Sequence, residues 1–310
     1  MATSLFLLVA LLAVVSLLGL FVGAVISYRR TRVVGINEHV GLVRLARRAR
    51  LWRLGALGFA VLMCVAVPVL GIAAADTTPG MVPALAGTLV VAVICVSEAT
   101  FRRPMTTTRS AALRPRSLGD FVPRGWLGLA TTTLIALAAV LTAGWVMAGP
   151  DDLGRAGTAF TAVCGDVTHT ITPWPGSHYA LPIATATAVS VALAVVTCLV
   201  IARRPSPAAE SAELDSELRR WSIGAVLQSL TLVACLTLIP LLLLMARGAR
   251  IAECADGDTG TLAILAIIGA GLAAVLAFVA FIALCTGPSV RVNDIPPPSR
   301  GDAAPVGVPR

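Results

Sequence analysis

The chain alternates between long apolar runs with almost no charge and short polar segments rich in arginine. Seven runs reach about 20 residues, the length that a helix needs to cross the hydrocarbon core of a bilayer. They lie near residues 4–28, 54–74, 81–100, 126–148, 179–202, 222–246 and 261–286. The pattern predicts an all-α membrane protein, in which residues 1–287 form a bundle of seven transmembrane helices.

Composition supports this fold class. Hydrophobic residues make up 57% of the chain and charged residues only 13%, against about 25% charged in a soluble domain. The remaining residues, 288–310, are rich in proline, glycine and alanine. Such a segment cannot bury a core, and we expect a disordered cytoplasmic tail.

The first apolar run has two interpretations. A secretory signal has a basic start and a short apolar core, whereas Met1–Ser4 carries no basic side chain and the run exceeds 20 residues. Arginines follow the run at Arg29, Arg30 and Arg32. This order favours an uncleaved anchor with its N-terminus outside.

Arginine counts predict the orientation of the bundle, because short cytoplasmic loops carry the excess of basic residues. With the N-terminus outside, twenty-one of the 24 arginines lie on the inner side and three on the outer side. The C-terminus is then cytoplasmic, and a bacterial plasma membrane is the expected location.

Tryptophan and arginine recur together where predicted helices leave the inner face. The pairs are Trp52 with Arg53, Arg124 with Trp126, and Arg220 with Trp221. Both residue types prefer the headgroup region, which predicts six interface anchors. Their recurrence reflects either convergent anchoring or three related hairpins that follow one N-terminal helix.

Two of the seven cysteines, Cys164 and Cys254, fall in different outer loops. The outer side of a bacterial membrane permits disulfides, so the two predict one cross-loop bridge; two free thiols are the alternative. The longer loop, 150–178, also contains Asp166, His169 and His178, but their spacing matches no zinc site. We expect it to form a compact lid, with Trp174 and Tyr179 at the outer interface.

The inner segment 29–53 has apolar residues at helical spacing and arginines on another face. An amphipathic helix lying on the inner leaflet fits this pattern and attracts anionic lipid. Arg44, Arg47 and Arg48 are the candidate lipid-binding residues. Membrane lipid and another membrane protein are the expected partners, because the basic loops offer no fold that reads nucleic acid.

Ionisable groups inside a membrane are markers of function, and this chain has few. Glu98 lies near the inner end of the third run, four residues before Arg102, which predicts an ion pair at the helix end. Gln228 lies about 10 Å inward from Trp221 at 1.5 Å per residue. We expect its amide to bond to a neighbouring helix.

The runs Arg109–Arg124 and Cys164–Pro182 resemble segments of uncharacterised multi-spanning membrane proteins of high-GC Gram-positive bacteria. The resemblance covers most of the chain and implies no activity. The sequence has no phosphate-binding loop, zinc-protease motif or nucleophile elbow, so we expect neither an enzyme nor a cofactor. An accessory or scaffold component of a membrane complex is the first hypothesis. The alternatives are a transporter or permease subunit for a small neutral or apolar solute and, third, a membrane enzyme or sensor.

Overall fold

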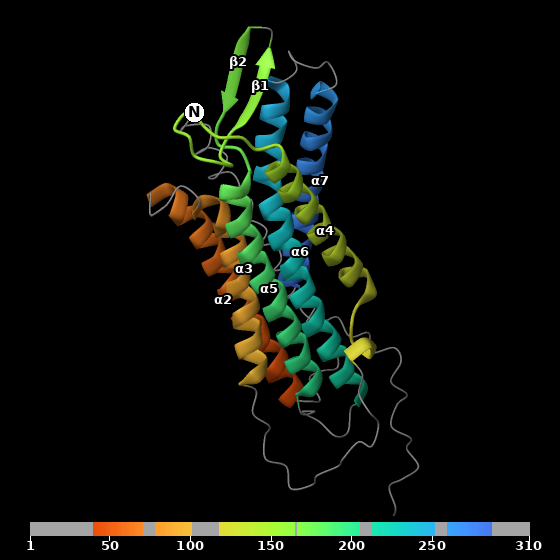
Figure 1. Ribbon diagram of the computed structural model, residues 1–310. Coiled ribbons are helices and arrows are strands. Elements are labelled where there is room, and N and C mark those ends of the chain that lie inside the picture. The colour runs from red at the N-terminus through yellow and green to blue at the C-terminus, as the bar shows by residue number, and fades with distance from the viewer. Residues whose placement is uncertain are drawn as a thin grey trace, which may run out of the picture.

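The computed structural model describes residues 40–70, 78–100, 118–164, 166–204, 212–251 and 259–286. Within them, long helices run up and down in an antiparallel bundle (Figure 1). The helices are α2 (Val40–Leu70), α3 (Thr78–Ala99), α4 (Arg124–Val146), α5 (Ser177–Arg203), α6 (Ala212–Ile251) and α7 (Thr259–Cys285). A short 3-10 helix, η2 (Leu118–Asp120), precedes α4.

Six of the described helices are long and apolar enough to cross a membrane. They correspond to the second to seventh predicted runs. The first predicted run, 4–28, and the tail 288–310 lie outside the described residues, so the seventh helix, the orientation and the disordered tail stay predictions.

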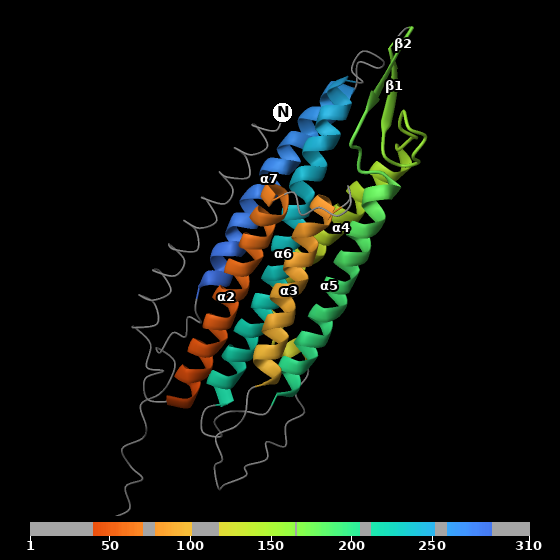
Figure 2. The same cartoon turned by 90° about the vertical axis from the view of Figure 1, so that its left-hand side faces the viewer.

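The bundle has two different ends, and Figure 2 shows the hairpin at only one of them. At one end, here the arginine end, α2, α4 and α6 begin and α3, α5 and α7 finish, and a cluster of arginines and carboxylates lies between them. At the other, here the hairpin end, the strands β1 (Phe160–Cys164) and β2 (Val167–Ile171) extend beyond the helices (Figure 1).

The segment before the second apolar run is not a separate helix. Residues from Val40 onward continue without a break into the apolar part of α2, so the amphipathic helix predicted to lie along the membrane is instead the beginning of α2. The prediction of a separate surface helix was wrong, because α-helical periodicity continues unchanged from the arginine-rich part into the apolar part.

Helix α6 lies at the centre of the bundle and contacts α3, α4, α5 and α7. Its interfaces use small residues: a Cβ added at Gly87 of α3 would overlap Val233 of α6. The buried residues of α7 include five alanines: Ala263, Ala270, Ala273, Ala277 and Ala280. Small side chains let membrane helices approach closely.

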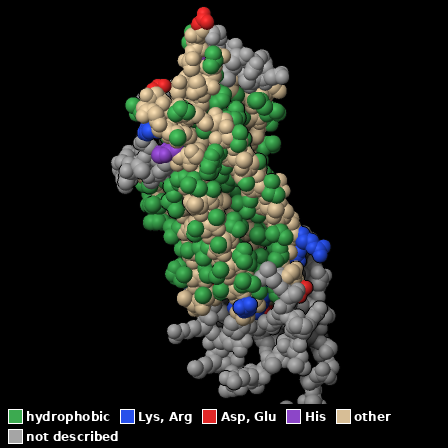
Figure 3. Space-filling model, in the orientation of Figure 1, with side chains coloured by type: hydrophobic (Ala, Val, Ile, Leu, Met, Phe, Trp, Pro, Cys, Tyr) green, Lys and Arg blue, Asp and Glu red, His purple; other side chains and the backbone are tan. Residues whose placement is uncertain are grey.

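The predicted hairpins pack unequally. Helices α2 and α3 lie side by side, as do α6 and α7, but α4 packs mainly on α6 rather than on α5. The proposed relation between three hairpins therefore stays a hypothesis. Outward-facing side chains are mostly apolar, and Figure 3 shows hydrophobic side chains covering the visible flank.

A single tryptophan fixes the base of the hairpin to the bundle. Trp174 is 2% exposed, donates its indole N–H to the carbonyl of Gly144 at 2.9 Å and stacks on Phe160 with ring centroids 4.6 Å apart. Gly248 of α6 leaves room for its ring. Trp174 is therefore buried within the protein and not exposed at the outer interface as predicted, because Gly248 makes room for its ring and the carbonyl of Gly144 accepts its indole N–H.

Candidate functional site

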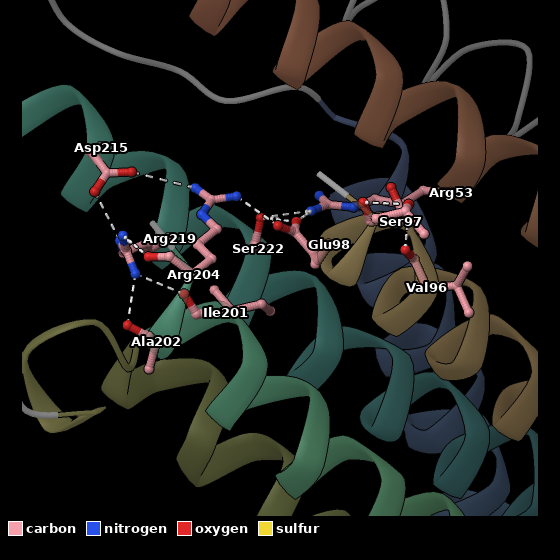
Figure 4. A network of polar contacts seen from close by, with 11 residues as sticks. Arg53, Val96, Ser97, Glu98, Ile201, Ala202, Arg204, Asp215, Arg219 and Ser222 are labelled. Carbon is pink, nitrogen blue, oxygen red and sulfur yellow. Dashed lines mark hydrogen bonds and ion pairs between the residues drawn. The ribbon is translucent and has the colours of Figure 1, made fainter. Parts of the chain in front are cut away.

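Six polar residues form one buried cluster at the arginine end (Figure 4). The members of this arginine network are Arg53, Glu98, Arg204, Asp215, Arg219 and Ser222, and none is more than 5% exposed. They come from α2, the last turn of α3, the residue after α5, and the beginning of α6. The network therefore joins two pairs of consecutive helices, α2 with α3 and α5 with α6, which are distant from each other in the sequence.

Glu98 is at the centre of the network. Its Oε2 lies 2.6 Å from Nη1 of Arg204, and its Oε1 accepts a 2.7 Å hydrogen bond from the hydroxyl of Ser222. Arg53 donates to the same hydroxyl at 3.1 Å and lies 3.9 Å from Oε1. The carboxylate thus has partners from three other elements, whereas the partner predicted from helical spacing, Arg102, lies outside the described residues.

The side chain of Arg219 on α6 caps the C-terminal end of α5. Its Nη1 donates to the carbonyls of Ile201 at 2.8 Å and Ala202 at 2.7 Å, and its Nη2 donates to that of Arg204 at 2.7 Å. The last carbonyls of a helix have no partner within the helix. Asp215, one turn earlier on α6, holds Nε of Arg219 at 2.9 Å. Asp215 therefore orients the guanidinium of Arg219, which caps the neighbouring helix α5.

Trp221 extends the network to α7. The guanidinium carbon of Arg53 lies 3.6 Å from the centre of the Trp221 ring, a cation–π contact. The indole N–H of Trp221 donates to the carbonyl of Thr286 at 3.3 Å. Both residues were predicted as lipid-interface anchors, and for Arg53 this was wrong: its side chain is buried against Glu98, Ser222 and Trp221.

The other predicted anchors lie nearer the surface. Trp52 is 43% exposed, Arg124 and Arg220 are exposed, and Trp126 is partly buried. Of the predicted lipid-binding residues, Arg47 and Arg48 are exposed at the arginine end, where Arg48 also donates to Thr100 at 2.9 Å. The side chain of Arg44 lies outside the described part of the structure.

The charges of the network do not balance. Three guanidinium groups face two carboxylates, and the buried Nη1 of Arg53 and Nε of Arg204 have no hydrogen-bond partner. Removing either acid would leave three arginines close together with a single carboxylate to compensate them. The arrangement is suited to clamping helices, since each charged group is held by another element and none lies open to a ligand-sized partner.

Gln228, the other predicted intramembrane polar residue, does not join the network. It is partly buried on α6, and within the described residues its amide has no hydrogen bond. A different pair links helices at mid-bundle: the hydroxyls of Thr88 on α3 and Ser190 on α5 lie 2.5 Å apart. The expected bond from Gln228 to a neighbouring helix is therefore not found in this part of the chain. Sequence reasoning missed the Thr88–Ser190 pair because isolated hydroxyls carry no pairing signal.

The predicted disulfide involves residues outside the described part of the structure. Cys254 lies there, as does the side chain of Cys164, whose backbone pairs with Val167 beside the hairpin turn. The bridge stays a prediction. Five cysteines of the described helices are free thiols: Cys64, Cys95, Cys198, Cys235 and Cys285. Among the residues for which side chains are described, no group of three or more His, Cys, Asp or Glu is placed to hold a metal ion.

Comparison of the chain with protein-family profiles, with curated proteins and with solved structures finds no match.

Proposed function

We propose that this chain is an integral plasma-membrane protein that acts as a scaffold, an accessory component of a membrane complex. The observation that carries the proposal is the arginine network, which ties α2, α3, α5 and α6 together through buried ion pairs. A buried network of this kind keeps its helices in fixed positions, because separating them would leave charges unpaired at a cost of about 3–5 kcal/mol.

Hydroxyl groups deeper in the bundle also form hydrogen bonds within the bundle. Thr133, Thr197 and Thr237 each donate to the carbonyl four residues earlier, at 2.7–3.0 Å. Ser190 donates to Ala186 and lies against Thr88. Hydroxyls bonded in this way stabilise helix contacts and are not directed to a passing solute, which supports a packed scaffold over a transport pathway.

The orientation that we propose places the arginine end in the cytoplasm. Exposed arginines at this end are Arg47, Arg48, Arg124, Arg203 and Arg220. An arginine near an anionic leaflet gains about 1 kcal/mol, so this ring would bind the headgroups of the inner leaflet and hold the bundle at a fixed depth.

Cysteine accessibility tests the scaffold against the transporter. Ser190→Cys and Thr237→Cys place a thiol at buried positions of α5 and α6, in a chain whose native cysteines are replaced by alanine. A small water-soluble thiosulfonate should not label either variant, because packed helices admit no water. Thr168→Cys, on the exposed face of the hairpin, is the control that must react. Rapid labelling at Ser190→Cys would instead reveal an aqueous path and favour transport of a small neutral solute past Gln228.

A further inference from the structure

We draw no further inference here: the strongest candidate, the cluster of buried donor groups at Nη1 of Arg53 and Nε of Arg204 that have no hydrogen-bond partner in the described part of the chain, belongs to the arginine network already described and is closed off from solvent, which leaves no room beside it for an ion or another ligand.

Discussion

The carboxylate of Glu98 is where the separate contacts of the arginine end meet. One oxygen accepts a hydrogen bond from Arg204 after α5, and the other accepts one from the hydroxyl of Ser222 on α6. The same hydroxyl accepts a hydrogen bond from Arg53 of α2. With Asp215, Glu98 compensates three arginines. Removing a single negative charge here should therefore affect several helices at once.

Glu98→Gln should lower the free energy of unfolding by about 3–5 kcal/mol, because it leaves Arg53 and Arg204 buried with less compensation. Glutamine keeps the shape of the side chain, so packing is preserved. Unfolding of the purified protein in detergent, followed by exposure of the free thiols, measures the change. The exposed Glu217→Gln is the matched control and should change stability by less than about 0.5 kcal/mol. Equal stability of both variants would contradict the clamp.

For single residues, the sequence indicated which charged side chains matter better than it indicated which residues they contact. Glu98 was singled out because acids are rare in apolar runs, but its partners come from segments that no spacing rule connects with it. Arg53 was assigned to the lipid interface, because its position beside Trp52 resembles a headgroup anchor and burial depends on what α3 and α6 place against it. The burial of Trp174 likewise depends on residues of other helices, Gly248 and Gly144, which the local sequence does not reveal.

Helix contacts in this bundle depend on small residues at defined positions. Gly87 of α3 faces Val233 of α6 so closely that a Cβ would overlap the valine side chain, and Val233 is 4% exposed. Valine has a stiff side chain and cannot move aside cheaply. The distance between α3 and α6 is therefore set at this pair.

Gly87→Ala should destabilise the bundle by about 1–3 kcal/mol through overpacking, even though alanine favours the helix by about 1 kcal/mol. Val233→Ala should also destabilise it, by leaving a cavity. The double variant should recover much of the loss, because the new methyl group occupies the vacated space. Thermal unfolding of the four proteins forms a double-mutant cycle, and strictly additive effects would show that the two positions do not interact. Gly125→Ala, where a Cβ meets nothing within 4 Å, controls for helix propensity.

The helices themselves were predictable, while the hairpin was not anticipated. An apolar run of about 20 residues can form few structures other than a membrane-spanning helix. Predicted spans such as 126–148 therefore agree closely with the observed helices, here α4 (Arg124–Val146). The sequence predicts a compact lid for the loop 150–178, in which β1 and β2 lie. A signal was present, since five-residue runs rich in threonine and valine around a two-residue turn are typical of a hairpin. Helix α6 extends beyond the predicted membrane span 222–246 at both ends, to Ala212 and Ile251.

For the whole molecule, two chemically different ends and an apolar flank define how it would lie in a bilayer. The arginines of the described helices gather mainly at one end, and large apolar side chains such as Leu262, Ile264 and Leu272 face outward between the ends. The positive-inside rule predicts that the arginine end lies in the cytoplasm. Orientation follows from loop composition rather than from packing.

Labelling of intact cells with a membrane-impermeant maleimide checks this orientation. In a cysteine-free chain, Thr168→Cys on the hairpin should react at once, and Arg203→Cys at the arginine end should react only after the cells are permeabilised. Both positions are exposed, so a difference reports the side of the membrane and not burial. The reverse pattern would invert the topology, and with it the assignment of the lipid-facing arginine ring.

The contact of Arg219 with the end of α5 bears on how the chain is assembled during synthesis. The carbonyls of Ile201, Ala202 and Arg204 leave the ribosome before the side chain that binds them. Glu98 likewise emerges before Arg204 and Ser222. Until α6 has entered the membrane, the carbonyls at the end of α5 lack Arg219 and Glu98 lacks Ser222, although Arg53 and Arg204 have already been synthesised. Insertion of α6 is thus the event that completes this end of the bundle, because α6 supplies both Arg219 and Ser222.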